Sequence, residues 1–393
     1  MRQKLLEEID ILVGDLNHLF TQLITHQFSF AIWRLPDSKT SYLLIDLGTQ
    51  SGNNRSSIEE LSECFILNPF NKNHPPHPLI LSGDVIIKFS DEKHETNISP
   101  RMSANDIEKL LGISQSVYDK RTPKSQKPIT KSHDFIQKVE KAIAEIRNGN
   151  AHKIVLSRFE EFSLSETFSF KECFELLKSN YPNAFCYLTH TTDYGTWMGA
   201  SPENLISIEN DRIFKTESLA GTQYLPEIDN LGDVAWTQKE IEEQAMVSRY
   251  IIGCLKKIRL REFEESGPKT VRAGKLVHLK TEYKVDMVET NTPELGSVML
   301  ELLHPTSAVC GSPFEQADKF IKENEGYDRA LYSGFLGPVN FDKSTHLFVN
   351  LRCMQILGDK ARLFAGAGIT EDSNPEKEYL ETVNKMKTLA DLL

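Results

Sequence analysis

Residues 366–385 read GAGITEDSNPEKEYLETVNK. The Gly-Ala-Gly opening predicts a turn whose backbone N–H groups can approach an anion closely. The rest predicts a helix with Glu378, Glu381 and Lys385 on one face, because these residues are three and four positions apart. Paired carboxylates on one face suit Mg²⁺, which prefers oxygen ligands. A glycine-rich turn before a surface helix with ordinary ion pairs gives the same pattern, so both interpretations stay open on this segment alone.

The composition describes an ordinary globular chain. It has 393 residues, of which 39% are hydrophobic and 26% are charged, and its net charge is −11. This charge argues against a general nucleic-acid binder, which needs a basic face, but it does not exclude a small anionic substrate in a buried site. The six scattered cysteines lack any C-x-x-C spacing and read as reduced core residues. We therefore expect a cytoplasmic protein.

No segment is apolar over the length that a bilayer-spanning helix needs, so we expect no membrane contact. Apolar residues recur at helical spacing between Leu5 and Leu23, which predicts an amphipathic helix rather than a signal peptide. The basic segment Lys120–His133 contains Pro and Ser, and reads either as a linker or as a long surface loop. Strands come in groups with interspersed helices and without strict βαβ alternation. This order favours an α+β fold with a mostly antiparallel sheet.

Two charged residues stand in apolar surroundings. Lys153 opens the apolar run KIVLSRF, and a desolvated lysine can lose its proton and act as a base. The alternative is a lysine at a strand edge that reaches water. Glu203 ends the turn ASPE after another apolar run, and a buried carboxyl can keep its proton and act as an acid. The alternative is a turn carboxylate in water.

Further positions carry weaker signals. Ala220, Gly221 and Thr222 form a small-residue turn whose N–H groups and hydroxyl could hold a carboxylate, although tight turns commonly look like this. Glu243 lies in a helix predicted over residues 237–259, as a metal ligand or as part of a solvated acidic face.

Two more residues interrupt apolar strands. Arg352 lies in a strand predicted from Leu347 to Ile356, where a buried guanidinium needs an anionic partner such as a carboxylate. His278 lies in another predicted strand, and a satisfied core histidine is an alternative to a binding role there.

Taken in order, these segments resemble the chorismate-utilising enzymes, which include isochorismate, salicylate, anthranilate and aminodeoxychorismate synthases. The resemblance covers roughly residues 134–393. It rests on KIVLSR from Lys153, GASPE to Glu203, LAGT to Thr222, KEIEEQ from Lys239, His278-Leu279, LHPTSAVCGSP from Leu303, RALYSG from Arg329, Leu351-Arg352, GAGI from Gly366 and ETVNK to Lys385.

The family implies large, mostly antiparallel sheets packed as a sandwich with flanking helices. Residues 131–393 are then the chorismate-binding catalytic region, and residues 1–130 a less recognisable β-rich part of the same fold. Lys153, together with Ala220 before Gly221-Thr222, resembles the branch that adds water. The chain is therefore similar to isochorismate synthases of the menaquinone or siderophore type. Chorismate is the implied substrate, with no glutaminase subunit and a monomer or homodimer as the assembly.

The resemblance also assigns roles. Lys153 is the implied base that takes a proton from water, and Glu203 the acid that protonates the departing C4 hydroxyl. Mg²⁺ is implied at Glu243 and Glu381 with Glu378 nearby. The implied substrate contacts are Ala220, Gly221, Thr222, His278, Tyr332, Arg352, Gly366, Ala367, Gly368 and Lys385.

One position departs from the family, which usually has His where this chain has Gln244. Neither proposed proton transfer uses this position, so we expect activity to survive. Three other functions remain in competition. They are a salicylate synthase that also eliminates pyruvate, an ammonia-using synthase subunit, and a chorismate sensor without activity.

Overall fold

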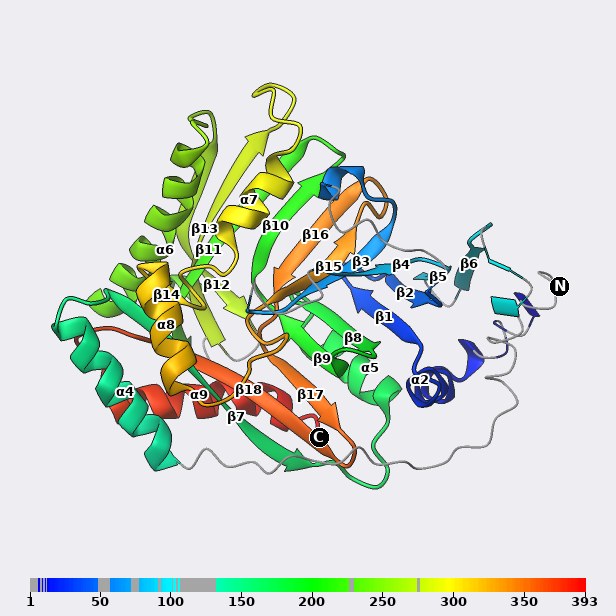
Figure 1. Ribbon diagram of the computed structural model, residues 1–393, viewed down its shortest axis with the longest axis horizontal. Coiled ribbons are helices and arrows are strands. Elements are labelled where there is room, and N and C mark those ends of the chain that lie inside the picture. The colour runs from blue at the N-terminus through cyan, green and yellow to red at the C-terminus, as the bar shows by residue number, and fades with distance from the viewer. Residues whose placement is uncertain are drawn as a thin grey trace.

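Two antiparallel sheets dominate the computed structural model of the chain (Figure 1). The structure describes residues 13–48, 57–71, 78–90, 93–100, 132–225, 230–273 and 276–393, with a few isolated positions before residue 13 and between residues 102 and 106. Residues 120–131 of the linker predicted over Lys120–His133 lie outside this part of the chain, as does the predicted boundary at residue 130, whereas Ser132 and His133 belong to a helix, α4 (Ser132–Arg147).

The first sheet has ten strands, and every recorded pairing is antiparallel. Their order across the sheet is β14 (Gly311–Ser312), β7 (Lys153–Ser163), β18 (Lys360–Ile369), β17 (Cys353–Leu357), β9 (Gly195–Ser201), β8 (Phe185–Thr191), β1 (Ser29–Arg34), β2 (Ser41–Asp46), β5 (Val85–Ser90) and β6 (Lys93–Ile98).

The second sheet has eight strands and is also antiparallel in every recorded pairing. Its order is β12 (Glu264–Ala273), β13 (Leu276–Asp286), β11 (Ile213–Tyr224), β10 (Asn204–Glu209), β16 (Ser344–Val349), β15 (Phe335–Val339), β3 (Cys64–Asn68) and β4 (Leu79–Ser82). Strands from the first hundred residues therefore complete both sheets.

Helices flank the two sheets (Figure 1). The described helices are α2 (Leu16–Thr25), α4 (Ser132–Arg147), α5 (Phe170–Asn180), α6 (Gln238–Lys257), α7 (Leu295–Leu303), α8 (Phe314–Asn324) and α9 (Pro375–Ala390), with short 3-10 turns η1 (Ile58–Glu60) and η2 (Leu231–Asp233). The predicted α+β sandwich is confirmed. No helix in the described ranges has the length and apolar character that crossing a membrane requires.

The core between the sheets is aromatic. Trp33 of β1 lies 5.1 Å from Phe65 of β3, measured between ring centroids. Phe185 of β8 stacks on Phe348 of β16 at 4.3 Å, which joins the middle of one sheet to the other. Aromatic contacts of this kind bury much apolar surface and fix the relative placement of the two layers. The site described below depends on that placement because it draws residues from both.

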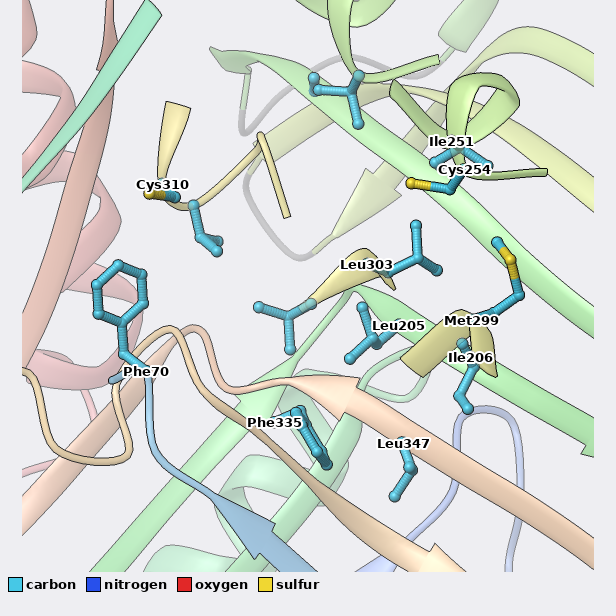
Figure 2. Packing of buried hydrophobic residues seen from close by; sticks show 14 of the residues in the cluster. Phe70, Leu205, Ile206, Ile251, Cys254, Met299, Leu303, Cys310, Phe335 and Leu347 are labelled. Atoms are coloured by element: carbon cyan, nitrogen blue, oxygen red, sulfur yellow. The ribbon is translucent and has the colours of Figure 1, made fainter. Parts of the chain in front are cut away.

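The helices cover the outer faces with aliphatic side chains. Figure 2 shows Ile251 and Cys254 of α6 and Met299 of α7 in the cluster that also holds Leu205 and Ile206 of β10. On the other sheet, α2, α5 and α9 form a separate cluster with the outer face. Helices α6 and α9 thus belong to opposite layers, although both carry predicted site residues.

All six cysteines are buried and unpaired, as the sequence predicts.

Candidate active site

One cavity lies where the two layers meet and encloses about 710 Å³, including space that opens to solvent. It is lined from both sheets and from α6 and α9. The predicted site residues that line it are Glu203, Ala220, Gly221, Thr222, Glu243, His278, Tyr332, Arg352, Gly366, Gly368 and Lys385. Lys153, Ala367, Glu378 and Glu381 are not in its lining, although three of these four are tied to it by the ion pairs and electrostatic contacts described below.

Lys153 begins β7 and is fully buried. Its ammonium group lies 2.8 Å from Oε1 of Glu243, which reaches in from α6. Burial raises the pKa of Glu243, but the ammonium groups of Lys153, Lys385 and Lys239 outweigh burial and leave it lowered. The strand-edge alternative for Lys153 is therefore wrong: the side chain is buried and ion-paired.

Gly366 and Gly368 lie inside β18 rather than in a turn, so that part of the prediction is wrong. This segment pairs with β7 through Gly366 to Ser157, Ala367 to Leu156 and Gly368 to Val155, and these long-range ladder bonds override the local turn preference of glycine. Glycine inside a strand often marks a place where other groups approach closely.

The two glycines make room for the site. A Cβ atom at Gly368 would lie 2.7 Å from Oε1 of Glu243 and 2.8 Å from Cε of Lys153. A Cβ atom at Gly366 would lie 3.0 Å from the hydroxyl of Tyr332, which stacks on Phe364 with 5.2 Å between ring centroids. Glycine is thus required here by space rather than by backbone conformation.

Glu203 lies in the short connection between β9 and β10 and is buried. Burial, together with the charge of the neighbouring Glu217, raises the pKa of Glu203 to about 8, although Lys153, Lys385 and Arg352 act to lower it. The carboxyl is therefore protonated at neutral pH and can donate a proton. Glu217, which was not among the residues predicted from the sequence, lies in β11 and is ion-paired with Lys280 of β13.

Ala220, Gly221 and Thr222 form a bulge inside β11, not a terminal turn as predicted. The pairing register with β13 shifts between Ala220 and Thr222, and Gly221 has φ +71°, a conformation that favours glycine. The strand continues past the bulge because its ladder with β13 resumes at Thr222 opposite His278.

His278 is buried and hydrogen-bonded on one side. Its Nδ1 lies 3.1 Å from the carbonyl oxygen of Gly221 and 3.2 Å from Oγ1 of Thr222. Burial, then Arg352 and Lys385, lower the pKa of His278 to about 3, so the ring is neutral. Since the carbonyl of Gly221 can only accept, Nδ1 carries the proton. Nε2 is then a buried acceptor without a hydrogen-bond partner, on a residue that lines the cavity.

Arg352 lies between β16 and β17, so the single strand predicted over residues 347–356 is wrong. Its φ of +48° ends the β geometry and lets the two neighbouring strands belong to different sheets. The side chain lines the cavity, and no carboxylate of the described residues forms an ion pair with it. The guanidinium is therefore available to an anionic ligand.

Helix α9 supplies Lys385, which donates to the carbonyl oxygen of Gly366 at 2.9 Å and lies 2.6 Å from Oε1 of Glu381. Glu378 is buried and ion-paired with Lys239 of α6, and its Oε2 atom has no hydrogen-bond partner. Lys239 was not predicted from the sequence as a site residue either. Its position four residues before Glu243 on one helix was the available signal, but such spacing is typical of solvated helix faces as well.

The predicted metal ligands are held by lysines in this structure. Lys153 pairs with Glu243, Lys239 with Glu378 and Lys385 with Glu381. Across the described ranges, no group of three or more His, Cys, Asp or Glu side chains is arranged to hold a metal ion. The donor chemistry nevertheless fits Mg²⁺, because carboxylate oxygens are its preferred ligands and Oε2 of Glu378 is buried without a partner.

Gln244 is buried and turned toward the sheet. Its Nε2 atom donates to Oγ of Ser218 at 2.7 Å and to Oγ1 of Thr281 at 3.1 Å. Gln244 therefore fastens α6 to β11 and β13 directly behind Glu243. This is a contact that an uncharged amide makes without any change of protonation.

Arg329 lies behind the cavity wall, although its RALYSG segment contributes Tyr332 to the lining. Its guanidinium donates to the carbonyl oxygens of Val309 and Val155, each at 2.8 Å, and pairs with the equally buried Glu325. Val155 and Val309 both line the cavity. The buried pair thus links β7 to the turn that precedes β14 and holds this part of the wall in place.

Comparison with known proteins supports the resemblance to chorismate-utilising enzymes. The family model described as "Chorismate binding enzyme" matches residues 80–393, which begins well before the resemblance seen in the sequence. Isochorismate synthase DhbC of Bacillus subtilis is 27% identical over 67% of this chain and 68% of its own. Isochorismate synthase EntC of Escherichia coli is 29% identical over 65% of this chain and 66% of its own. The chain thus spans about two thirds of the length of these relatives.

The solved structures agree on the fold. MenF, the menaquinone-specific isochorismate synthase from Escherichia coli, superposes with a TM-score of 0.74 at 22% identity, covering 95% of this chain and 90% of that chain. Anthranilate synthase component I from Streptococcus pneumoniae superposes with a TM-score of 0.65 at 22% identity, covering 92% of this chain and 89% of that chain. With the family model covering most of its length, the chain belongs to the family of chorismate-binding enzymes.

Proposed function

We propose that this chain is an isochorismate synthase, which adds water at C2 of chorismate and releases the C4 hydroxyl with the help of Mg²⁺. The observation that carries the proposal is that Glu203, whose carboxyl keeps its proton at neutral pH, lines the same cavity as Glu243, the ion-pair partner of the buried Lys153. The names of the relatives in the family support the same reaction.

In the proposed reaction, Lys153 acts in its neutral form, so its ammonium group first releases a proton to solvent. The amine then takes a proton from water while the water oxygen bonds to C2. The ring double bonds shift, the C4–O bond breaks, and Glu203 donates its proton to the departing oxygen. One water enters and one leaves, so chorismate and isochorismate have the same composition. The reaction leaves Lys153 protonated and Glu203 ionised, and exchange with solvent restores both.

Anion-binding groups orient the substrate in this proposal. Arg352, the Tyr332 hydroxyl and Lys385 would contact the enolpyruvyl carboxylate, because Arg352 has no carboxylate partner among the described residues. The bulge at Ala220–Thr222 would contact the ring carboxylate. His278 offers Nε2 as an acceptor for a ring hydroxyl.

Glu243 and Glu381, with Glu378 close by, would hold Mg²⁺. A bound Mg²⁺ would neutralise the ring carboxylate of chorismate and offset the charge of the acidic side chains around it. The surrounding residues then have separate tasks: Gly368 leaves space for Lys153 and Glu243, and Gln244 holds α6 in position behind them.

The test is a product assay with purified protein, chorismate and MgCl₂, analysed by chromatography and mass spectrometry. Isochorismate is the expected product. Salicylate with pyruvate would identify the salicylate-synthase alternative, and an aminated product that needs ammonium would identify the ammonia-using one. K153Q should lose turnover by about 10²- to 10⁴-fold. K319Q, at a lysine whose side chain is 76% exposed, is the matched control. Unchanged chorismate, or full turnover by K153Q, would refute the proposal.

A further inference from the structure

A buried carboxylate on one helix takes its counter-ion from another helix in the opposite layer. Glu378 of α9 is 1% exposed, and Lys239 of α6 is its ion-pair partner. Helix α9 packs on the ten-stranded sheet and α6 on the eight-stranded sheet (Figure 1). The pair therefore crosses the seam between the layers. Burying a carboxylate is costly unless it is paired, so this contact is a substantial link between the two helices.

Lys239 lies among all three proposed metal ligands. Besides its contact with Glu378, it interacts electrostatically with Glu381 and with Glu243, which is four residues further along α6. Its ammonium group satisfies Oε1 of Glu378. The hydroxyl of the nearby Ser373 also favours the ionised carboxylate, but Oε2 stays buried without a hydrogen bond of normal geometry. A buried carboxylate oxygen without a hydrogen bond, close to two other carboxylates, indicates that a second cation can bind there.

Three lysines, Lys153, Lys239 and Lys385, are paired with Glu243, Glu378 and Glu381, and these six residues form the carboxylate cluster. The three lysines differ in their access to water. The side chain of Lys153 is 1% exposed and that of Lys385 is 17% exposed, whereas that of Lys239 is 33% exposed. Lys239 is the second residue of α6, two positions after the N-cap residue Thr237. A long lysine side chain at a helix end can turn to solvent at small cost. Lys239 is thus the lysine that can leave the cluster without unpacking the core.

We infer that Lys239 occupies the carboxylate cluster as a built-in cation and that a divalent cation displaces it. The inference rests on the metal site of the proposed function. In the metal-free protein, Lys239 neutralises Glu378 and clamps α9 to α6. A divalent cation takes over both tasks, and Lys239 then moves to water. Since binding must first displace Lys239, the lysine weakens the affinity for the cation.

The test compares the wild-type chain with K239Q, using MgCl₂ as the probe without chorismate. Isothermal titration calorimetry should show about tenfold tighter Mg²⁺ binding by K239Q. In EDTA, the melting temperature of K239Q should be lower by about 2 °C or more, because Glu378 loses its partner. Saturating Mg²⁺ should remove this difference. K377Q changes the same charge at an exposed position beside Glu378 and should behave as wild type.

Several results would overturn the inference. These are equal or weaker Mg²⁺ binding by K239Q, the same gain in K377Q, or no Mg²⁺ binding by either protein. If K239Q does not fold in EDTA, the comparison moves to the E378Q background, where adding K239Q should leave the melting temperature unchanged; a further drop there would overturn the clamp. Turnover of chorismate by the same samples reports separately on the proposed function.

Discussion

The ammonium group of Lys153 lies 2.8 Å from Oε1 of Glu243, and the missing side chain of Gly368 leaves the space that both groups occupy. The lysine comes from the ten-stranded sheet and the glutamate from the helix over the eight-stranded sheet. The chemistry that we propose therefore depends on how the two layers are docked.

Substituting Gly368 with alanine tests this arrangement. The new methyl group would lie within 3 Å of both Glu243 and Lys153, so one of them has to move. We expect G368A to keep its fold and to lose about 100-fold in kcat/KM, since displacements of about 1 Å in a catalytic group can cost this much. G253A is the control because nothing lies within 4 Å of that position. Wild-type turnover by G368A would show that the pair is not needed.

Replacing Glu203 with glutamine should abolish turnover and raise the melting temperature. The pKa of Glu203 is raised from 4.5 to about 8 in the folded chain. Between these values the folded state holds a proton that the unfolded state has released, so rising pH destabilises the wild type across this window. We expect E203Q to lose turnover, and its melting temperature to exceed that of the wild type by a margin that grows from pH 5 to pH 8.

Thermal unfolding of both proteins across this pH range measures the difference. E371Q changes a carboxylate at an exposed position and serves as the control. A constant difference between E203Q and the wild type would mean that Glu203 is ionised throughout the range.

Replacing Arg352 should affect substrate binding more than stability. Its guanidinium lines the cavity without an ion-pair partner in the described residues, and burial lowers its pKa. We expect R352Q to raise KM for chorismate by about 10- to 100-fold, the usual range for a lost charge-assisted hydrogen bond, without lowering the melting temperature. Steady-state kinetics and thermal unfolding provide the two readouts, with R249Q on the exposed side of α6 as the control. A large fall in melting temperature would instead assign Arg352 a structural role.

Replacing Arg329 should have the opposite effect. Arg329 and Glu325 are 2% and 3% exposed, and removing one partner leaves the other charge buried and unpaired. We expect R329Q to lose about 3–5 kcal/mol of unfolding free energy, measured by denaturant titration. K322Q breaks the more exposed Lys322–Asp318 pair on α8 and should lose less than about 1 kcal/mol. Similar losses in both variants would contradict the distinction between buried and exposed pairs.

The sequence predicted the class of fold because strand and helix periodicity are local properties. It also identified charged residues in apolar runs, and Lys153 and Glu203 prove to be buried, as expected of charges that are rarely placed in a core without a purpose. Local reasoning failed for Gly366–Gly368 and for Ala220–Thr222. It predicted turns, whereas pairing with β7 and β13 keeps both segments in strands.

The amino-acid sequence by itself determined which groups this chain has for chemistry: an amine, a carboxyl, three further carboxylates and a guanidinium. Only the tertiary structure decided their partners and protonation. Glu217 helps raise the pKa of Glu203, and Lys239 takes Glu378 as its partner across the seam. The reason is physical: electrostatic interactions depend on distance and burial in space, and these residues meet only after two sheets and two helices have packed together.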